Sequence, residues 1–239
     1  MTYREFRRQT RLSQEEFCQE VLAAHRQEIK AKKEHTAVKN LELIFEATLK
    51  VSNQKGFQAM TMRDLSKASG LSIGALYDYF AGKEALLEMI QETGRRITRR
   101  VMGQAVTDAQ TPPEKLASAI RAHIYLSEAM QPWFFFSYME ARHLGKVEKQ
   151  RSKEAEMATE RYISEVIKQG KRQGVFAPVD HQLTAAVIKG MLQDWYLKRW
   201  KYAKRRVSVD RYADFVVGLA QGYCRNGLGV AGVGEASDE

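Results

Sequence analysis

The chain has 239 residues, of which 44% are hydrophobic and 28% charged, and its formal net charge at pH 7 is +9. This length and composition suffice for one large or two modest domains with a buried core, and the positive charge suits a polyanionic partner. The longest strongly apolar run, residues 133–136, is far too short to cross a bilayer, which argues against a membrane-spanning protein.

The cysteines and the first residues indicate a cytoplasmic location. Cys18 and Cys224 lie far apart and show no metal-ligand spacing, so we expect a reducing compartment, no metal site and no cofactor. Residues 1–12 are polar and basic and lack the apolar stretch of a signal peptide.

The first expected helix spans residues 13–33. Ser13 and Glu16 have the spacing of a capping box, and an amphipathic pattern follows at Phe17, Val21, Leu22 and Ile29. Four arginines precede it: Arg4, Arg7, Arg8 and Arg11. This extension, residues 1–35, either adds phosphate or minor-groove contacts to a nucleic acid or is a flexible tail and a helix that packs on its own domain.

Three further helices are expected before residue 83. A broad apolar stripe predicts a helix over residues 37–55, ended by Gly56. Thr61 is suited to cap a short helix that Gly70 ends, and Ser72 is suited to cap another over residues 72–79. Two short helices joined by a glycine-containing turn are the signature of a helix-turn-helix.

The last of these helices has an unusual surface. Ile73, Gly74, Tyr77, Asp78 and Tyr79 replace the glutamate and lysine mixture of an ordinary solvated face. A glycine allows close approach of another surface, and tyrosine hydroxyls can bind phosphate oxygens. This pattern favours a contact surface.

The pattern T-x-R-D-L-x-x-A-S-G-L-S-x-G-A-L-Y-x-Y-F-x-x-K-E-A-L-L, which begins at Thr61, resembles the DNA-binding domain of the TetR family of bacterial transcriptional regulators. The resemblance covers about residues 36–87 and implies a DNA-binding domain over residues 36–83, with the helix at 72–79 in the major groove. It implies phosphate contacts from Thr61, Arg63, Ser72, Tyr77, Tyr79 and Lys83. It implies that Ile73, Gly74 and Asp78 face base edges.

The remainder of the chain is also expected to be helical. Residues 83–106 form the helix that links the two domains in the family, and a break near residues 107–113 precedes expected helices at 113–130, 132–144, 147–173, 180–203 and 208–226. No hairpin or period-two signal occurs. We therefore expect an all-α fold: the extra N-terminal helix, the three-helix DNA-binding domain, a ligand-binding and dimerisation bundle over residues 84–227, and a flexible tail over 228–239.

Aromatic and sulfur-containing side chains cluster around Pro132 and recur on later helices. A hydrophobic or aromatic small molecule would suit a cavity lined in this way, and the resemblance is the main reason to expect a cavity. The alternative is solid core packing. The candidate ligand-binding residues are His123, Trp133, Phe136, Met139, His143, Tyr162, Met191 and Trp195.

The last two long helices carry apolar stripes that are candidates for a dimer interface. Their residues are Ile188, Leu192, Tyr212, Phe215, Val216, Leu219 and Tyr223. In the family this pair of helices meets its copy across a two-fold axis, and two recognition helices need half-sites about 34–36 Å apart. The alternative is that both stripes serve the core of one chain.

Two other segments have weaker signals. The basic run 198–206 is either a solvated loop or a site for a carboxylate or for the phosphates of an acyl-CoA. Residues 227–232 satisfy GxGxxG, but only seven residues follow, so no βαβ unit can form around them.

No catalytic motif is present, so we expect no enzyme. We expect a ligand-responsive, homodimeric regulator of transcription: a repressor released from a palindromic operator in double-stranded DNA by a hydrophobic or aromatic effector, without a membrane partner. The alternatives are a helical adaptor that binds protein through the same exposed helix and an enzyme that processes a small molecule.

Overall fold

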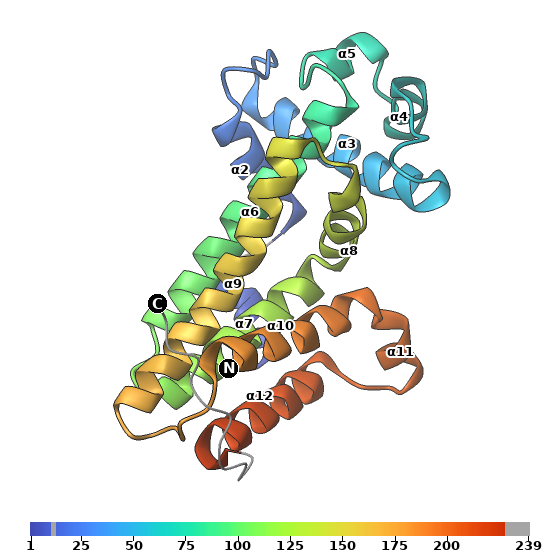
Figure 1. Ribbon diagram of the computed structural model, residues 1–239. Helices are drawn as coiled ribbons and strands as arrows, with labels where there is room; N and C mark the ends of the chain where they lie inside the picture. The colour runs from blue at the N-terminus through green and yellow to red at the C-terminus, as the bar shows by residue number, and fades with distance from the viewer. Residues whose placement is uncertain (11–12, 228–239) are drawn as a thin grey trace. The chain divides into compact units, whose positions relative to one another are not determined.

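The computed structural model describes residues 1–10 and 13–227, which form helices and no strand (Figure 1). The expected all-α fold is confirmed. The helices are α1 Tyr3–Thr10, α2 Gln14–Ala24, α3 Glu34–Lys55, α4 Met62–Ser69, α5 Ile73–Tyr77, α6 Lys83–Thr107, α7 Pro112–Ala129, α8 Gln131–Glu140, the 3₁₀ helix η1 Ala141–His143, α9 Lys146–Arg172, α10 His181–Leu197, α11 Arg199–Lys204 and α12 Val209–Asn226.

The chain divides into two compact units. Unit 1 contains residues 1–100 and 126–156, and unit 2 contains residues 101–125 and those from 157 onward. Within the described part of the chain, no helix is long and apolar enough to cross a membrane. The sequence-based domain limits at residues 35, 83 and 227 stay a prediction.

Unit 1 begins with a helix that the sequence analysis did not predict. Thr2 and Glu5 form a capping box at the start of α1, because the Thr2 N–H donates to Glu5 Oε2 at 2.7 Å and the Glu5 N–H donates to Thr2 Oγ1 at 3.3 Å. Phe6 is buried, so α1 packs on the unit. The T-x-x-E spacing of this capping box is visible in the sequence. Arg11 lies outside the described residues.

The helix expected over residues 13–33 is only partly correct. Ser13 and Glu16 do form the expected capping box, but α2 ends at Ala24. The chain then turns so that the Lys30 N–H donates to the Asp78 carbonyl at 2.8 Å, while Ile29 is buried. Ile29, the last apolar residue of the expected helix, is therefore a buried residue of the loop that follows α2. This loop is hydrogen-bonded to the end of α5.

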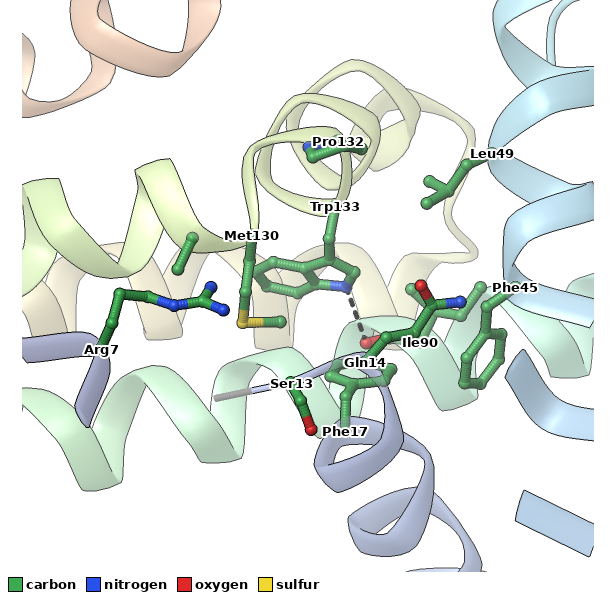
Figure 2. A pocket seen from close by; sticks show the side chains of 11 residues that line it. Arg7, Ser13, Gln14, Phe17, Phe45, Leu49, Ile90, Met130, Pro132 and Trp133 are labelled. Atoms are coloured by element: carbon green, nitrogen blue, oxygen red, sulfur yellow. Dashed lines mark hydrogen bonds between the residues drawn. The ribbon is translucent and has the colours of Figure 1, made fainter. Parts of the chain in front are cut away.

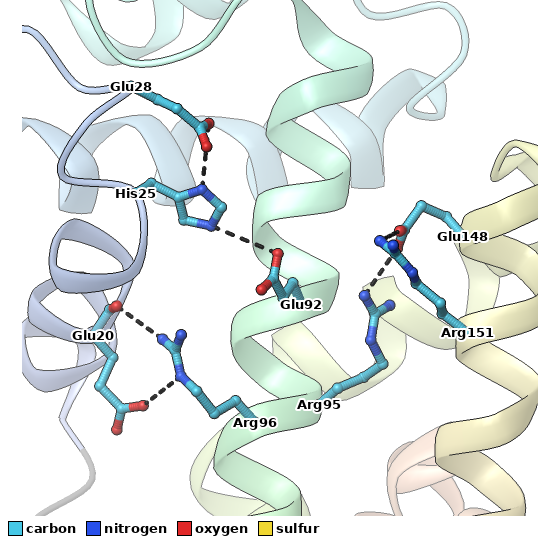
Figure 3. Close-up of polar contacts among 8 residues, drawn as sticks. All are labelled: Glu20, His25, Glu28, Glu92, Arg95, Arg96, Glu148 and Arg151. Carbon is cyan, nitrogen blue, oxygen red and sulfur yellow. Dashed lines mark hydrogen bonds and ion pairs between the residues drawn. The ribbon is translucent and has the colours of Figure 1, made fainter.

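The extension is also bonded to α6 (Figure 3). The Arg96 guanidinium donates to the Glu20 carbonyl at 2.8 Å, and Arg100 pairs with the Glu20 carboxylate at 2.6 Å. On the other side of α6, Arg95 pairs with the buried carboxylate of Glu148 at 2.9 Å. These α6 arginines therefore serve structural contacts within unit 1.

The helix expected over residues 180–203 is divided in two. The backbone of Lys198, at φ −119° and ψ 37°, separates α10 from α11. The expected flexible tail at 228–239 lies outside the described residues.

Candidate nucleic-acid interface

The first helix of the helix-turn-helix, α4, is held at its start by a polar network. The Asp64 N–H donates to Thr61 Oγ1 at 3.2 Å, and the Thr61 N–H donates to Asp64 Oδ2 at 2.8 Å. Lys55 of α3 donates to the same carboxylate at 2.5 Å. Hydrogen bonds from Lys55 and then Thr61 hold the pKa of Asp64 far below its usual range, so this carboxylate is ionised near neutral pH.

The turn and the second helix follow the expected local chemistry. Gly70 adopts the left-handed conformation at φ 74°, where a side chain would be strained, and its N–H donates to the Ser66 carbonyl. Ser72 Oγ accepts the Ala75 N–H at 3.1 Å and so caps α5. Leu76 is fully buried and anchors the inner face of this short helix.

The outer face of α5 is open to solvent. Ile73 is 37% exposed and Tyr77 is 47% exposed, and Ser72, Gly74 and Asp78 are exposed beside them. A Cβ atom added at Gly74 would meet only Ser72 Oγ, at 4.0 Å. Within the described residues, neither the packing nor the backbone therefore requires a glycine at position 74.

Tyr79 differs from the other candidates. Its side chain is buried, and its hydroxyl accepts a hydrogen bond from Asn40 Nδ2 at 2.9 Å. Burial raises the pKa of Tyr79. The phosphate contact expected for Tyr79 is therefore not supported, and the residue instead attaches the end of α5 to α3.

The remaining phosphate candidates lie at the edges of this surface. Thr61 and Arg63 are exposed on the first turn of α4. Lys83, at the start of α6, is partly exposed, and its Nζ donates to the Gln58 carbonyl at 2.6 Å. Lys83 therefore supports the segment between α3 and α4 in addition to any contact outside the chain, a role that its sequence position alone does not indicate.

Two family models match the chain. The model described as bacterial regulatory proteins, tetR family, matches residues 44–90, and the model described as tetracyclin repressor-like, C-terminal domain, matches residues 109–222. Together they cover more than half of the chain.

The chain belongs to the TetR family of bacterial regulatory proteins. The family comprises DNA-binding regulators, and the predicted function as a transcriptional regulator is confirmed. The exposed surface around α5 is thus the surface expected to bind DNA in this TetR-family protein.

Individual relatives agree with this assignment. The transcriptional regulator HbdR of Aromatoleum sp. strain CIB is 22% identical over 162 residues, which span 68% of this chain and 71% of HbdR. A TetR-family protein from Rhodococcus RHA1 has a TM-score of 0.70 and 24% identity, covering 78% of this chain and 97% of its own. AibR, solved with isovaleryl coenzyme A and operator DNA, has a TM-score of 0.65 and 21% identity, covering 76% of this chain and 97% of its own.

The four ligand-binding candidates in unit 1 of this TetR-family protein have different surroundings. Trp133 lines a pocket together with residues of the N-terminal extension. Phe136 packs edge-on against Phe57, with ring centroids 5.8 Å apart, Met139 is exposed, and His143 lies 4.0 Å from a Glu140 carboxylate oxygen.

Two of the four candidates in unit 2 are core residues, and the other two are half-buried. His123 is buried beside Lys189, with 3.0 Å between its Nε2 atom and the lysine Nζ. Trp195 is fully buried and stacks on Tyr212 at 4.8 Å between centroids. Tyr162 and Met191 are half-buried. Among the described residues, no group of three or more histidine, cysteine, aspartate or glutamate side chains is placed to hold a metal.

The dimer candidates separate into two sets. Ile188, Leu192, Tyr212 and Val216 are buried in unit 2 and form part of its core. Phe215 is 64% exposed, Leu219 is exposed and Tyr223 is half-buried. Exposed Leu183 and Val187 on α10 were absent from the predicted set, although their spacing of four residues places them on one helix face.

Part of the basic run, residues 198–206, forms ion pairs and ring contacts within unit 2. Lys198 and Lys201 donate to the two carboxylate oxygens of Asp194 at 2.7 and 2.5 Å, and the Tyr202 hydroxyl also donates to Asp194. Burial by itself raises the pKa of Asp194, but these three hydrogen bonds outweigh it and hold the pKa at about 2. The Arg199 guanidinium lies 4.5 Å from the centroid of the Trp195 ring.

Proposed function

We propose that the protein is a homodimeric cytoplasmic repressor that binds a palindromic operator and is released from it by a hydrophobic small molecule. The observation that carries this proposal is the outer face of α5, which exposes Ile73 and Tyr77 on a helix that buried Leu76 holds in place. A glycine within a helix costs about 1 kcal/mol relative to alanine. Since no described residue requires a glycine at position 74, close approach of another surface accounts for it.

In this proposal α5 lies in the major groove. Ile73 contacts a thymine methyl group, Gly74 lets the backbone approach the bases, and Asp78 accepts a hydrogen bond from a cytosine amino group. The phosphate-binding groups are Thr61, Arg63, Ser72, Tyr77 and Lys83, which set the position of the helix along the duplex. Tyr79 acts as an internal support for α5.

The exposed apolar side chains of α10 and α12 form the proposed dimer interface. We define this α10/α12 face by Leu183, Val187, Phe215 and Leu219. A shallow hollow of about 410 Å³ beside Phe215, lined also by Val187 and Met191, offers space for a side chain of a second copy. A two-fold dimer would present two recognition helices to the two halves of a palindrome.

The proposed effector is a hydrophobic molecule that binds one conformation better than another. The aromatic and sulfur-containing side chains of the chain support this chemistry, as does the isovaleryl coenzyme A bound to the structurally similar AibR. A ligand shifts a conformational equilibrium only by its differential affinity for the two states. A hundredfold loss of DNA affinity requires about 2.7 kcal/mol of coupling.

Selection from a randomised duplex pool, followed by sequencing of the retained DNA, tests the proposal. We expect a palindrome with half-sites about one helical turn apart. Ile73→Ala should change the preferred sequence, and Tyr77→Phe should weaken binding to all sequences. Tyr138→Phe is the matched control, because Tyr138 of α8 is exposed to nearly the same degree as Tyr77. If the pool shows no enrichment, or if both α5 variants behave like the control, the proposed interface is wrong.

A further inference from the structure

Unit 1 contains a cavity of about 310 Å³ beneath the N-terminal extension (Figure 2). Its walls come from α1 and α2 of the extension, from α3, from Ile90 of α6, and from the end of α7 and the start of α8. The eleven lining residues are Arg7, Ser13, Gln14, Phe17, Phe45, Leu49, Ile90, Ala129, Met130, Pro132 and Trp133. We propose that this cavity binds an aromatic or aliphatic carboxylate, with Arg7 paired to the carboxylate group.

The apolar part of the cavity is held in shape by packing within unit 1. Phe17 packs edge-on against Phe45, with ring centroids 5.5 Å apart, and lies 6.4 Å from the Trp133 ring. The indole N–H of Trp133 donates to the Ile90 carbonyl at 3.3 Å. The hydrogen bond and the neighbouring rings fix the orientation of the indole, so the wall is preformed for an apolar ligand.

Among the described residues that line the cavity, one side chain carries a formal charge. Arg7 is the single ionisable residue among the eleven, and within residues 1–10 and 13–227 its guanidinium has no carboxylate at ion-pair distance. A guanidinium next to an apolar cavity selects a planar anion, because it donates two parallel hydrogen bonds to a carboxylate. The amide of Gln14 is bonded to the Glu42 carbonyl at 3.2 Å, so this rim residue is held by α3.

The volume limits the size of the ligand. A water molecule occupies about 30 Å³ in the liquid, so the cavity of about 310 Å³ has the volume of about ten water molecules. A single aromatic ring with a short alkanoate chain fits this limit. 4-Phenylbutyrate has this shape and charge and is a suitable probe.

Occupation of the cavity would act on the DNA-binding elements, an inference that rests on the proposed function. Phe45 and Leu49 belong to α3, which packs on α4, and the extension bonds to the end of α5 through Lys30 and Asp78. A ligand that favours one position of α3 over another changes the fraction of molecules competent to bind DNA. The cavity therefore places the effector at the extension, a segment that the minimal DNA-binding pattern lacks.

Isothermal titration calorimetry of the full chain with 4-phenylbutyrate tests the site, with the neutral 4-phenylbutyramide as a second probe. We expect the carboxylate to bind more tightly than the amide by about tenfold, the ratio that corresponds to one charge-assisted hydrogen-bonded pair. Arg7→Gln should remove this difference. Arg8→Gln should keep it, because Arg8 is exposed on the same helix and carries the same charge but does not line the cavity.

A second variant tests whether the probes bind in this cavity, independently of the charge of Arg7. Ala129→Leu adds three carbon atoms to the wall and should abolish heat of binding for both probes, with helical content and thermal unfolding as the checks on folding. The proposal is overturned if neither probe binds, if the amide binds as well as the acid, or if Arg7→Gln and Ala129→Leu bind as the unchanged protein does. The calorimetry contains no DNA, so absence of ligand binding would refute the cavity proposal without contradicting the proposed DNA binding. Absence of an enriched duplex would refute the proposed DNA binding without contradicting the cavity proposal.

Discussion

Gly94 in α6 determines whether Trp133 can occupy its place in the cavity wall. A Cβ atom added at Gly94 would lie 1.5 Å from Cζ2 of the indole, far inside the 3.5–4.0 Å of normal carbon contact. The Gly94→Ala change therefore forces the ring outward by about 2 Å. Such a movement breaks the hydrogen bond from the indole to Ile90.

The sign of the change in stability shows whether overpacking or helix propensity dominates at position 94. Alanine in a helix interior stabilises by about 1 kcal/mol relative to glycine. Overpacking costs about 1–3 kcal/mol, and the lost hydrogen bond adds about 0.5–1.5 kcal/mol. We expect Gly94→Ala to lower the free energy of unfolding by about 2 kcal/mol, measured by urea denaturation, and to abolish 4-phenylbutyrate binding.

Gly103 provides the control in the same helix. An added Cβ there would meet the Tyr162 hydroxyl at 3.4 Å, an ordinary contact, so Gly103→Ala should leave stability unchanged or raise it by up to about 1 kcal/mol. In a double-mutant cycle, Trp133→Ala should remove most of the cost of Gly94→Ala. If Gly94→Ala instead stabilises the protein as Gly103→Ala does, Trp133 does not pack on α6 in this way.

Three further predictions concern DNA affinity, pH and assembly. Lys83→Ala should weaken binding to all duplexes and reduce the slope of log affinity against log salt by about 1, as titrations at several salt concentrations would reveal. The pKa of Asp194 is lowered from 3.8 to about 2, so the ionised carboxylate contributes its full stabilisation above about pH 4 and loses it as the pH falls toward 2. Asp194→Asn should therefore make the free energy of unfolding less dependent on pH between 4 and 2, as measured by denaturation at each pH. Phe215→Glu should convert a dimer to a monomer in analytical ultracentrifugation, whereas Val147→Glu, which changes an equally exposed valine of unit 1, should not; equal masses for both variants would count against the α10/α12 face.

The sequence alone was sufficient for the elements whose chemistry is local. Ser13, Thr61 and Ser72 were predicted to cap helices, and each accepts the expected backbone N–H in the structure. Gly70 was predicted to end α4, and it does so in the left-handed conformation. These predictions succeed because a cap or a turn depends on residues within three or four positions of one another.

Tertiary structure decided which face of each helix is buried. Tyr77 and Tyr79 have the same chemistry two residues apart, yet one is exposed and the other bonds to Asn40 of α3. Likewise Val216 is buried and Phe215 is exposed on the same helix. Periodicity identifies an apolar stripe but not the neighbouring helix that covers it, because that neighbour is distant in sequence.

The cavity under the extension depends wholly on such distant contacts. Arg7, Phe45, Ile90 and Trp133 belong to four separate helices, and no spacing in the sequence relates them. Composition and motif were enough to predict an all-α regulator with a helix-turn-helix. The place where a small molecule can enter was decided by how the helices of unit 1 pack, since a cavity is the space that side chains from several elements fail to fill.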